Sequence, residues 1–285
     1  MKKIFVILLL VYGCVGGYAQ ITYKMQLRDF NRAALDSYPQ RVISFQQTDS
    51  ICHVTIQSSS VMADTSLLKV VKSAVVDPGL SYPSDVLPFL EPTSLIDYRL
   101  PELQTIADTL LGNEKNVWSI IWKGLKFAST YIEVFDDSLA MEIDKGNSFT
   151  ADIATILRRR KGTCSEYTNL FIALMRSKSV PCRFITGYVY YPPQITGGTH
   201  AWAECYVNGV GWIPVDPQAG QLGFPVEIKL FAGKDYPDCG IKDLSDIVPL
   251  SIEIEKIIPT SIWNNLNSTD ITNKSILPCT RPNIF

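Results

Sequence analysis

The sequence has little of what binds metal ions or nucleic acids. Its 285 residues include only two histidines, His53 and His200, and no two of its seven cysteines have C-x-x-C spacing. The formal net charge is -2, and the only basic cluster, at residues 158–161, has the composition of a solvated helix end. We therefore expect no metal site, no cofactor and no nucleic-acid partner.

Long apolar runs are also absent after the first residues. Residues 4–11 form an apolar run of eight that follows Lys2 and Lys3. Such a run is too short to span a bilayer and is typical of a secretory signal peptide. The sequence thus predicts export, periplasmic or extracellular, with no stable membrane span.

The processing site has two interpretations. Small residues at Gly17 and Ala19 predict cleavage before Gln20, which makes residues 1–19 the signal peptide. Lipidation at Cys14 is the alternative, and the bulky Tyr12 disfavours it.

Export bears on the cysteines, because an oxidising compartment permits disulfides. Six cysteines remain without Cys14, and a chain of this length folds without covalent crosslinks. If Cys164 is a reactive thiol, at least one of the other five stays unpaired. The pairing remains open among Cys52, Cys182, Cys205, Cys239 and Cys279.

The chain divides into regions of different pattern. Residues 20–91 hold "RVISFQ" and "CHVTIQ", which have strand composition, and "SLLKVVKSAVV", which fits helix or strand. This region is predicted to be a smaller, mixed β accessory part, and contact with a surface polymer or glycan is one use for it. Apolar residues at helical spacing then predict helices over 100–111 and 117–127. Residues 92–235 are assigned as the catalytic core and residues 236–285 as a C-terminal extension packed on it.

A cysteine stands at a helix boundary in "KGTCSEYTNLFIALMRS". Thr163 and Glu166 have the spacing of a capping box, which places Cys164 at the first helical position. The helix dipole and the free N–H groups there favour the thiolate and can stabilise an oxyanion. The structural alternative is a small apolar residue at a cap.

A strand pair follows in "THAWAECYVNGVGWIPVDPQAG". A two-residue turn at Asn208 and Gly209 would point His200 and Asp216 to opposite faces. A three-residue loop with Gly209 in the left-handed conformation pairs Tyr206 with Val210 and sets His200 directly opposite Asp216. This second register also buries Ala201, Ala203, Ile213 and Val215 together, so it is the predicted one.

These residues form a nucleophile, a base and an orienting carboxylate. His200 would accept the proton of the Cys164 thiol, and Asp216 would hold the imidazole tautomer. Each residue alone also fits a structural role, in a strand for His200 and in a turn for Asp216. His53 lacks such neighbours and is interpreted as an incidental strand residue.

The same stretches resemble the transglutaminase-like superfamily. The matching motifs are "KGTCSEYTNLFIALMRSKSVPCRFITGY", "THAWAECYV" and "GWIPVDP", in the family's order. The resemblance implies an α+β fold with a papain-like core, in which a helix bearing Cys164 packs on an antiparallel sheet bearing His200 and Asp216. Phe127 stands where relatives often have tyrosine, so Tyr131 is a weak substitute for that hydroxyl. Tyr131, Trp202 and Ser165 are further candidates for lining the site or binding an oxyanion.

The resemblance implies a thioester-forming first half-reaction. Hydrolysis of a peptide or amide bond, in a peptide or protein substrate, is the leading hypothesis. The alternatives are acyl transfer to a lysine amine, as in a crosslinking transglutaminase, and a non-catalytic binding domain of the same fold.

Overall fold

The computed structural model describes residues 18–77, 81–145, 150–191, 196–223, 225–241 and 244–260. The predicted signal peptide up to residue 17, and with it Cys14, lies outside these ranges, as does Cys279. Tyr18 and Ala19 are the first residues of the first strand.

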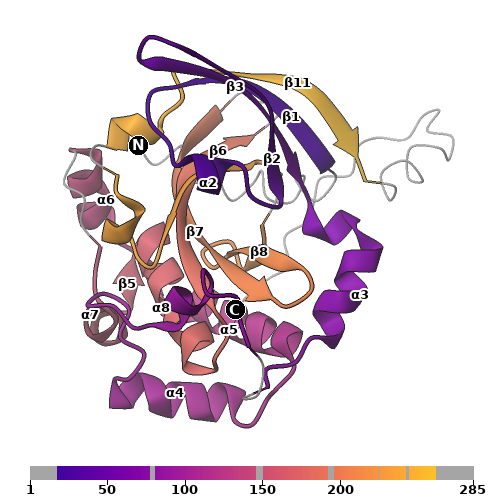
Figure 1. Ribbon diagram of the computed structural model, residues 1–285. Helices are drawn as coiled ribbons and strands as arrows, with labels where there is room; N and C mark the ends of the chain where they lie inside the picture. Colours follow the sequence, from indigo (N-terminus) through magenta and orange to yellow (C-terminus); the bar gives the residue numbers. More distant parts are fainter. Residues whose placement is uncertain are drawn as a thin grey trace, which may run out of the picture.

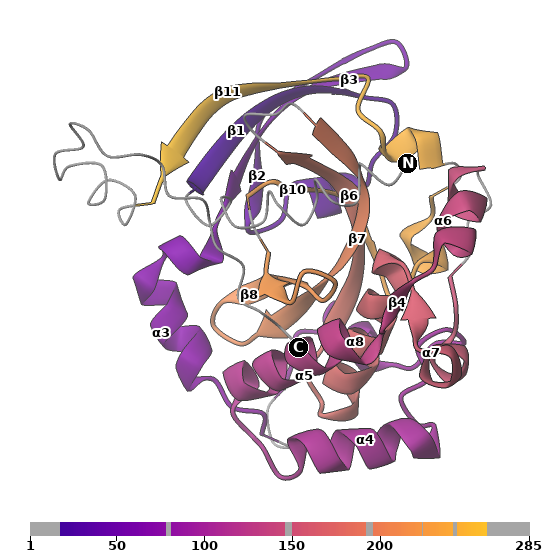
Figure 2. The same ribbon diagram turned by 180° about the vertical axis from the view of Figure 1, so that it is seen from behind.

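The fold is α+β, as predicted, with two antiparallel sheets and a group of helices. The strands are β1 (Tyr18–Leu27), β2 (Gln40–Thr48), β3 (Ile51–Ser59), β4 (Val134–Phe135), β5 (Lys161–Gly162), β6 (Cys182–Tyr191), β7 (Thr196–Val207), β8 (Gly211–Asp216), β9 (Gln221–Leu222), β10 (Glu227–Gly233) and β11 (Ser251–Pro259). The α-helices are α2 (Arg32–Leu35), α3 (Thr65–Ser73), α4 (Pro101–Leu111), α5 (Val117–Tyr131), α6 (Asp137–Asp144), α7 (Ile153–Arg159) and α8 (Cys164–Ser177). Both views show the N-terminal sheet at one end of the molecule and α4, α5 and α8 at the other (Figures 1 and 2).

The N-terminal sheet has the strand order β11-β1-β3-β2. Alternate residues of β1 and β3 are buried, because one face of this sheet packs on the rest of the protein. Tyr23 on that face is fully buried, and its hydroxyl donates to the carbonyl of Pro225 at 3.1 Å. The N-terminal region is thereby joined to the core by both packing and hydrogen bonds.

The C-terminal residues divide between the two sheets. The short 3-10 helix Pro237–Cys239 packs against β6 and β10, with Cys239 buried. Farther along the chain, β11 pairs with β1 and is an edge strand of the N-terminal sheet. From the sequence we predicted a C-terminal extension packed on the core. The pairing of β11 with β1 was not predictable, because the residues of a strand do not specify which strand it pairs with.

The core sheet has the strand order β10-β6-β7-β8-β9, and α8 packs on β6 and β7. The predicted helices are present as α4 and α5, and α5 continues to Tyr131. The segment that fitted helix or strand forms α3. Ala201, Ala203, Ile213 and Val215 are buried together in the core, as the hydrophobic pattern predicted.

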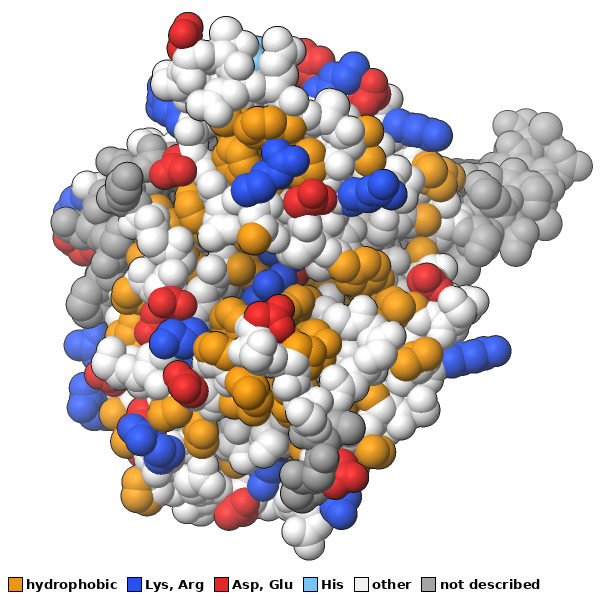
Figure 3. All heavy atoms as spheres, viewed as in Figure 1, with side chains coloured by type: hydrophobic (Ala, Val, Ile, Leu, Met, Phe, Trp, Pro, Cys, Tyr) orange, Lys and Arg blue, Asp and Glu red, His pale blue; other side chains and the backbone are white. Residues whose placement is uncertain are grey.

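The surface carries charges of both signs. On the face in view in Figure 3, acidic and basic side chains are interspersed, with apolar patches between them. This distribution agrees with the small net charge of -2. Among the described helices, none combines the length and apolarity that crossing a membrane requires.

Candidate active site

Cys164 is the first residue of α8, and the predicted capping box is present. The carboxylate of Glu166 is fully buried and accepts from the Thr163 N–H at 2.7 Å and from the Thr163 hydroxyl at 2.8 Å. Its other oxygen accepts from the Thr150 hydroxyl at 2.9 Å and the Ala151 N–H at 2.8 Å. Four hydrogen bonds therefore fix the helix start that carries the thiol.

Close packing before the helix requires a glycine. A Cβ atom on Gly162 would lie 2.3 Å from the Cβ of Glu166, which is too near for any side chain. The glycine of the "KGTCSE" motif thus lets β5 approach α8 directly ahead of Cys164.

Cys164 differs from the other described cysteines in its exposure. It is half-buried, whereas the other four are buried, namely Cys52, Cys182, Cys205 and Cys239. The sulfurs of Cys182 and Cys205 lie 3.6 Å apart on β6 and β7, and both are free thiols in this structure. Of the described thiols, Cys164 is the one that solvent and a substrate can reach.

His200 and Asp216 are in direct contact. His200 Nε2 lies 3.0 Å from Asp216 Oδ2, and both side chains are buried. Asp216 Oδ1 accepts from the N–H groups of Gln218 and Ala219 at 2.9 and 3.0 Å. The turn after β8 therefore holds the carboxylate in one orientation, with Oδ2 facing the histidine.

The predicted strand register is wrong by two residues. Tyr206 pairs with Trp212 rather than with Val210, so Asp216 does not lie opposite His200 across the ladder. The loop still has three residues, but they are residues 208–210 rather than 207–209, because Val207 pairs with Gly211. Gly209 has a φ of 79°, as predicted, and Gly211 after the loop also has a positive φ, of 104°. Because a shift of two preserves the alternation of faces, the two side chains still share a face and meet diagonally.

The electrostatics favour a charged imidazole. Burial lowers the pKa of His200, but the charge and hydrogen bond of Asp216, together with the interaction with Cys164, outweigh burial. The pKa of His200 is therefore raised well above its usual value. Since Nε2 faces Asp216, Nδ1 is the ring nitrogen left to exchange a proton with Cys164.

Tyr131 does not supply a hydroxyl to the thiol. Its hydroxyl donates to the carbonyl of Leu157 at 3.1 Å, and its ring stacks on Phe127 with centroids 4.9 Å apart. The reason is that α5 continues to Tyr131 and turns this side chain towards α7. The suggestion that Tyr131 substitutes for the family's tyrosine is therefore not supported by its position.

Trp202 and Ser165 lie next to the proposed catalytic residues. The Trp202 ring is stacked near the imidazole of His200, with centroids 6.0 Å apart, and is 1% exposed. Ser165 is also buried, one residue after Cys164. Because Trp202 is buried, its ring packs against His200 and is not available to contact a substrate.

Two positioning contacts had only faint sequence signals. The Thr168 hydroxyl lies 2.8 Å from the carbonyl of Cys164 and 3.3 Å from that of Ala201, so it links the start of α8 to β7. The second contact is the pair of hydrogen bonds from the Gln218 and Ala219 N–H groups to Asp216, which the turn sequence did not predict. An aspartate directly before a turn is the sequence pattern that indicates hydrogen bonds from the turn's N–H groups to its carboxylate.

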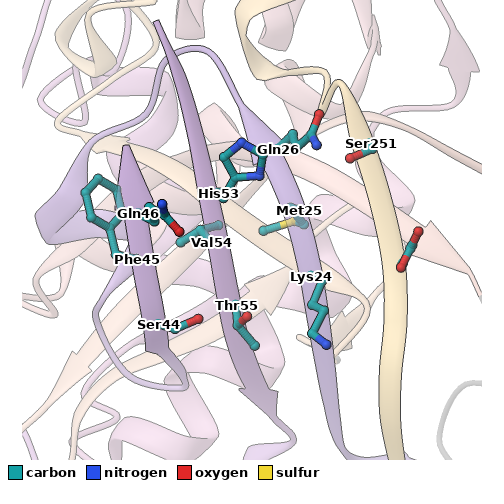
Figure 4. A pocket seen from close by; sticks show the side chains of 11 residues that line it. Lys24, Met25, Gln26, Ser44, Phe45, Gln46, His53, Val54, Thr55 and Ser251 are labelled. Carbon is teal, nitrogen blue, oxygen red and sulfur yellow. The ribbon is translucent and has the colours of Figure 1, made fainter. Parts of the chain in front are cut away.

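A hollow of about 360 Å³ lies elsewhere, on the outer face of the N-terminal sheet. Figure 4 shows Gln26, His53 and Ser251 near one end of it, and Lys24 and Thr55 nearer the other. His53 is thus a strand residue outside the Cys164 site, as interpreted from the sequence. Within the described ranges, no group of three or more histidine, cysteine or acidic side chains is arranged to hold a metal ion.

Comparison with known families supports the resemblance. Residues 128–217 match the family model of the transglutaminase-like superfamily, and this range includes Cys164, His200 and Asp216. An uncharacterised protein of Mycobacterium leprae is 26% identical over 88 residues, covering 29% of this chain and 31% of the relative. An uncharacterised protein of Haemophilus influenzae is 26% identical over 165 residues, covering 48% of this chain and 41% of the relative. The chain thus matches about a third to two fifths of the length of these relatives.

Two solved structures are similar to this chain to different degrees. A candidate cysteine protease from Cytophaga hutchinsonii superposes with a TM-score of 0.51 at 17% identity, covering 85% of this chain and 90% of that one. The periplasmic domain of TgpA from Pseudomonas aeruginosa gives a TM-score of 0.41 at 14% identity, covering 73% of this chain and 92% of that domain. The family match and the superposition on the Cytophaga structure together support a transglutaminase-like, cysteine-protease-like fold for the core of the chain.

Proposed function

We propose that this protein is a cysteine-dependent acyl-transfer enzyme that cleaves peptide or amide bonds through a thioester, with water as the preferred acceptor. The observation that carries the proposal is the half-exposed Cys164 beside a buried His200, whose Nε2 is held 3.0 Å from Asp216. A nucleophile, a base and an orienting carboxylate are the groups that acyl transfer needs.

The proposed reaction uses the three residues in turn. Transfer of the thiol proton to Nδ1 of His200 gives the imidazolium that the raised pKa of His200 favours, and the Cys164 thiolate attacks the carbonyl carbon of the substrate. The resulting oxyanion lies near the first N–H groups of α8, those of Cys164 and Ser165, which precede the helix's own hydrogen bonds. His200 then protonates the leaving amine as the C–N bond breaks, and a thioester on Cys164 remains.

The second half-reaction consumes the thioester. His200 removes a proton from water, the hydroxide oxygen attacks the thioester carbonyl, and the sulfur leaves as thiolate. The product is a carboxylate. A lysine amine in place of water would give an isopeptide bond, which is the transglutaminase alternative.

Location and partners are part of the proposal. The basic start and short apolar run at residues 2–11 support export. The substrate is then a peptide or protein of the periplasm or the extracellular medium.

The proposal is tested by thiol reactivity and by product analysis. Iodoacetamide labelling at pH 6, read by peptide mass spectrometry, should modify Cys164 first, because this thiol is half-exposed and lies beside the imidazolium of His200. Buried Cys182 and Cys205 in the same digest are the internal controls. Labelling of Cys164 no faster than these thiols would contradict the nucleophile assignment.

Peptide libraries then separate the two acceptors. Purified protein should release free carboxylate or ammonia, and Cys164→Ala should release none. If an added primary amine is incorporated in place of hydrolysis, acyl transfer is the principal reaction instead.

A further inference from the structure

The central strand β7 has one edge that is only half covered. On one side it pairs with β6 from Thr196 to Cys205. On the other side β8 pairs only with Ala203–Val207, and β9 pairs with β8 rather than with β7. The N-terminal half of β7 therefore has no strand neighbour on its β8 side within the described residues.

The free backbone groups on this edge can be identified. The Tyr206 N–H donates to the carbonyl of Pro181, so even-numbered residues of β7 direct their backbone groups towards β6. The Val207 carbonyl accepts from Val210 in the hairpin, so odd-numbered residues face β8. Because this direction alternates along an antiparallel strand, the N–H and C=O groups of Gly197 and Thr199 face the open edge.

The open edge begins at the thiol-bearing helix. Ala201 is the last odd-numbered residue before the β8 ladder, and its carbonyl is contacted by the Thr168 hydroxyl. The same hydroxyl contacts the carbonyl of Cys164 at 2.8 Å. Thr199 is the next position outward on that edge, and it directly precedes His200.

Nothing described covers this stretch. Gly197, Gly198 and Thr199 are exposed. A Cβ atom on Gly198 would meet no heavy atom within 4 Å, whereas one on Gly197 would meet Tyr188, so one face of the strand is open here as well. A free strand edge with exposed backbone groups is a template for pairing with another extended chain.

We propose that a substrate polypeptide binds as an added antiparallel or parallel strand on this edge, with its main chain hydrogen-bonded to the N–H and C=O of Thr199. This inference rests on the proposed function, which it deepens by naming the substrate class: an extended stretch of polypeptide, recognised through its backbone. Main-chain hydrogen bonds supply affinity whatever side chains the substrate carries. It would also carry the target carbonyl past Cys164.

The test compares a peptide reagent with a small one. Tripeptide chloromethyl ketones and iodoacetamide both alkylate the Cys164 thiolate with loss of halide, but only the peptide can pair with the edge. We expect Thr199→Pro, which removes the N–H from the open edge and leaves the β6 ladder intact, to slow the peptide reagent at least about tenfold relative to iodoacetamide. Thr199→Ala, which keeps the N–H, is the matched control and should retain the wild-type ratio.

A second measurement needs no variant. N-methylation of the tripeptide at each amide in turn should produce at least one reagent with a similar loss on the wild-type protein. An unchanged rate ratio in Thr199→Pro, together with indifference to every N-methyl group, would overturn the pairing while leaving the cysteine mechanism intact. A Cys164 that reacts no faster with iodoacetamide than the buried thiols would overturn the proposed function itself.

Discussion

Two buried polar groups lie on the same face of β7, four residues apart, and they have different surroundings. Glu204 lies towards the hairpin end of the strand, and His200 lies towards the open end. Both side chains are buried and both contact groups of opposite charge. The comparison shows which features separate a structural charge from a reactive one.

Glu204 is surrounded by cations. Its carboxylate accepts from Arg183 Nε at 2.7 Å and from Lys229 Nζ at 2.6 Å, and both partners are themselves buried. Burial raises the pKa of Glu204, but the two cations outweigh it, and the pKa is lowered. The cluster joins β6, β7 and β10 and offers no group to a substrate.

His200 has one carboxylate partner and one accessible neighbour. The turn holds Asp216 in place, and His200 also interacts with the half-exposed thiol of Cys164. Perturbed titration is common to both clusters, so it does not identify an active site by itself. His200 differs from Glu204 in that it lies beside a half-exposed nucleophile and next to an open strand edge.

The largest effect on turnover that we expect is that of Asp216→Asn, which tests the role assigned to His200 in contrast to Glu204. Backbone N–H groups occupy Oδ1, so the asparagine amide would present its NH₂ to Nε2 of His200. The imidazole would then carry its proton on Nδ1 and be unable to accept one from Cys164. We expect turnover to fall by about 10³–10⁴-fold with the fold retained.

Stability measurements give an independent readout of this variant. The raised pKa of His200 stabilises the wild type fully below the unfolded value of about 6.5, and this contribution is lost as pH rises through the folded value. The stability difference between wild type and Asp216→Asn should therefore shrink at alkaline pH in chemical denaturation. Retention of more than a tenth of the activity would show that the carboxylate does not set the tautomer.

The contrast also explains what the sequence could predict. The helix start at Cys164 was predictable because capping boxes and helical spacing are local patterns. The shared face of His200 and Asp216 was predictable from alternation. Their offset was not, because the sequence around Asn208 and Gly209 allows the three-residue loop at residues 207–209 or at residues 208–210, where the structure has it.

Long-range pairing left no local signal. The pairing of β11 with β1 joins residues more than two hundred positions apart. The composition of either strand does not indicate which strand it pairs with. The Glu204 cluster likewise assembles from three strands, each of which shows only an ordinary charged residue in sequence.

The second prediction concerns the structural cluster. Glu204→Gln would leave Arg183 and Lys229 buried without a counter-charge, at a cost of about 3–5 kcal/mol in the free energy of unfolding. The thiol chemistry at Cys164 should change little in the protein that remains folded. Denaturant unfolding and iodoacetamide labelling, measured on the same sample, separate the two effects.

The pH dependence of that variant has a defined sign. Burial lowers the pKa of Lys229 to about 8 even with Glu204 opposing it, whereas the unfolded chain titrates near 10.4. Loss of Glu204 removes the interaction that raises this pKa, so in Glu204→Gln the unfolded state binds more protons than the folded state throughout this range. The stability of Glu204→Gln should therefore rise from about pH 8 to about pH 10. Glu255→Gln, which breaks an exposed pair with Lys24, is the control and should leave the unfolding midpoint unchanged. A loss of labelling that exceeds the loss of folded protein would place Glu204 in the reactive site after all.

The smallest expected effect is that of Tyr131→Phe. The Tyr131 hydroxyl bonds the carbonyl of Leu157 at 3.1 Å, so its removal should cost about 1 kcal/mol of stability or less. Turnover should stay within about twofold of wild type, whereas loss of an oxyanion donor costs about 10²–10³-fold. Tyr167→Phe, which removes a matching bond to the carbonyl of Ile132 from α8 itself, is the control for helix positioning. A drop in kcat of a hundredfold in Tyr131→Phe alone would mean that this hydroxyl leaves Leu157 and turns to the thiol when substrate binds.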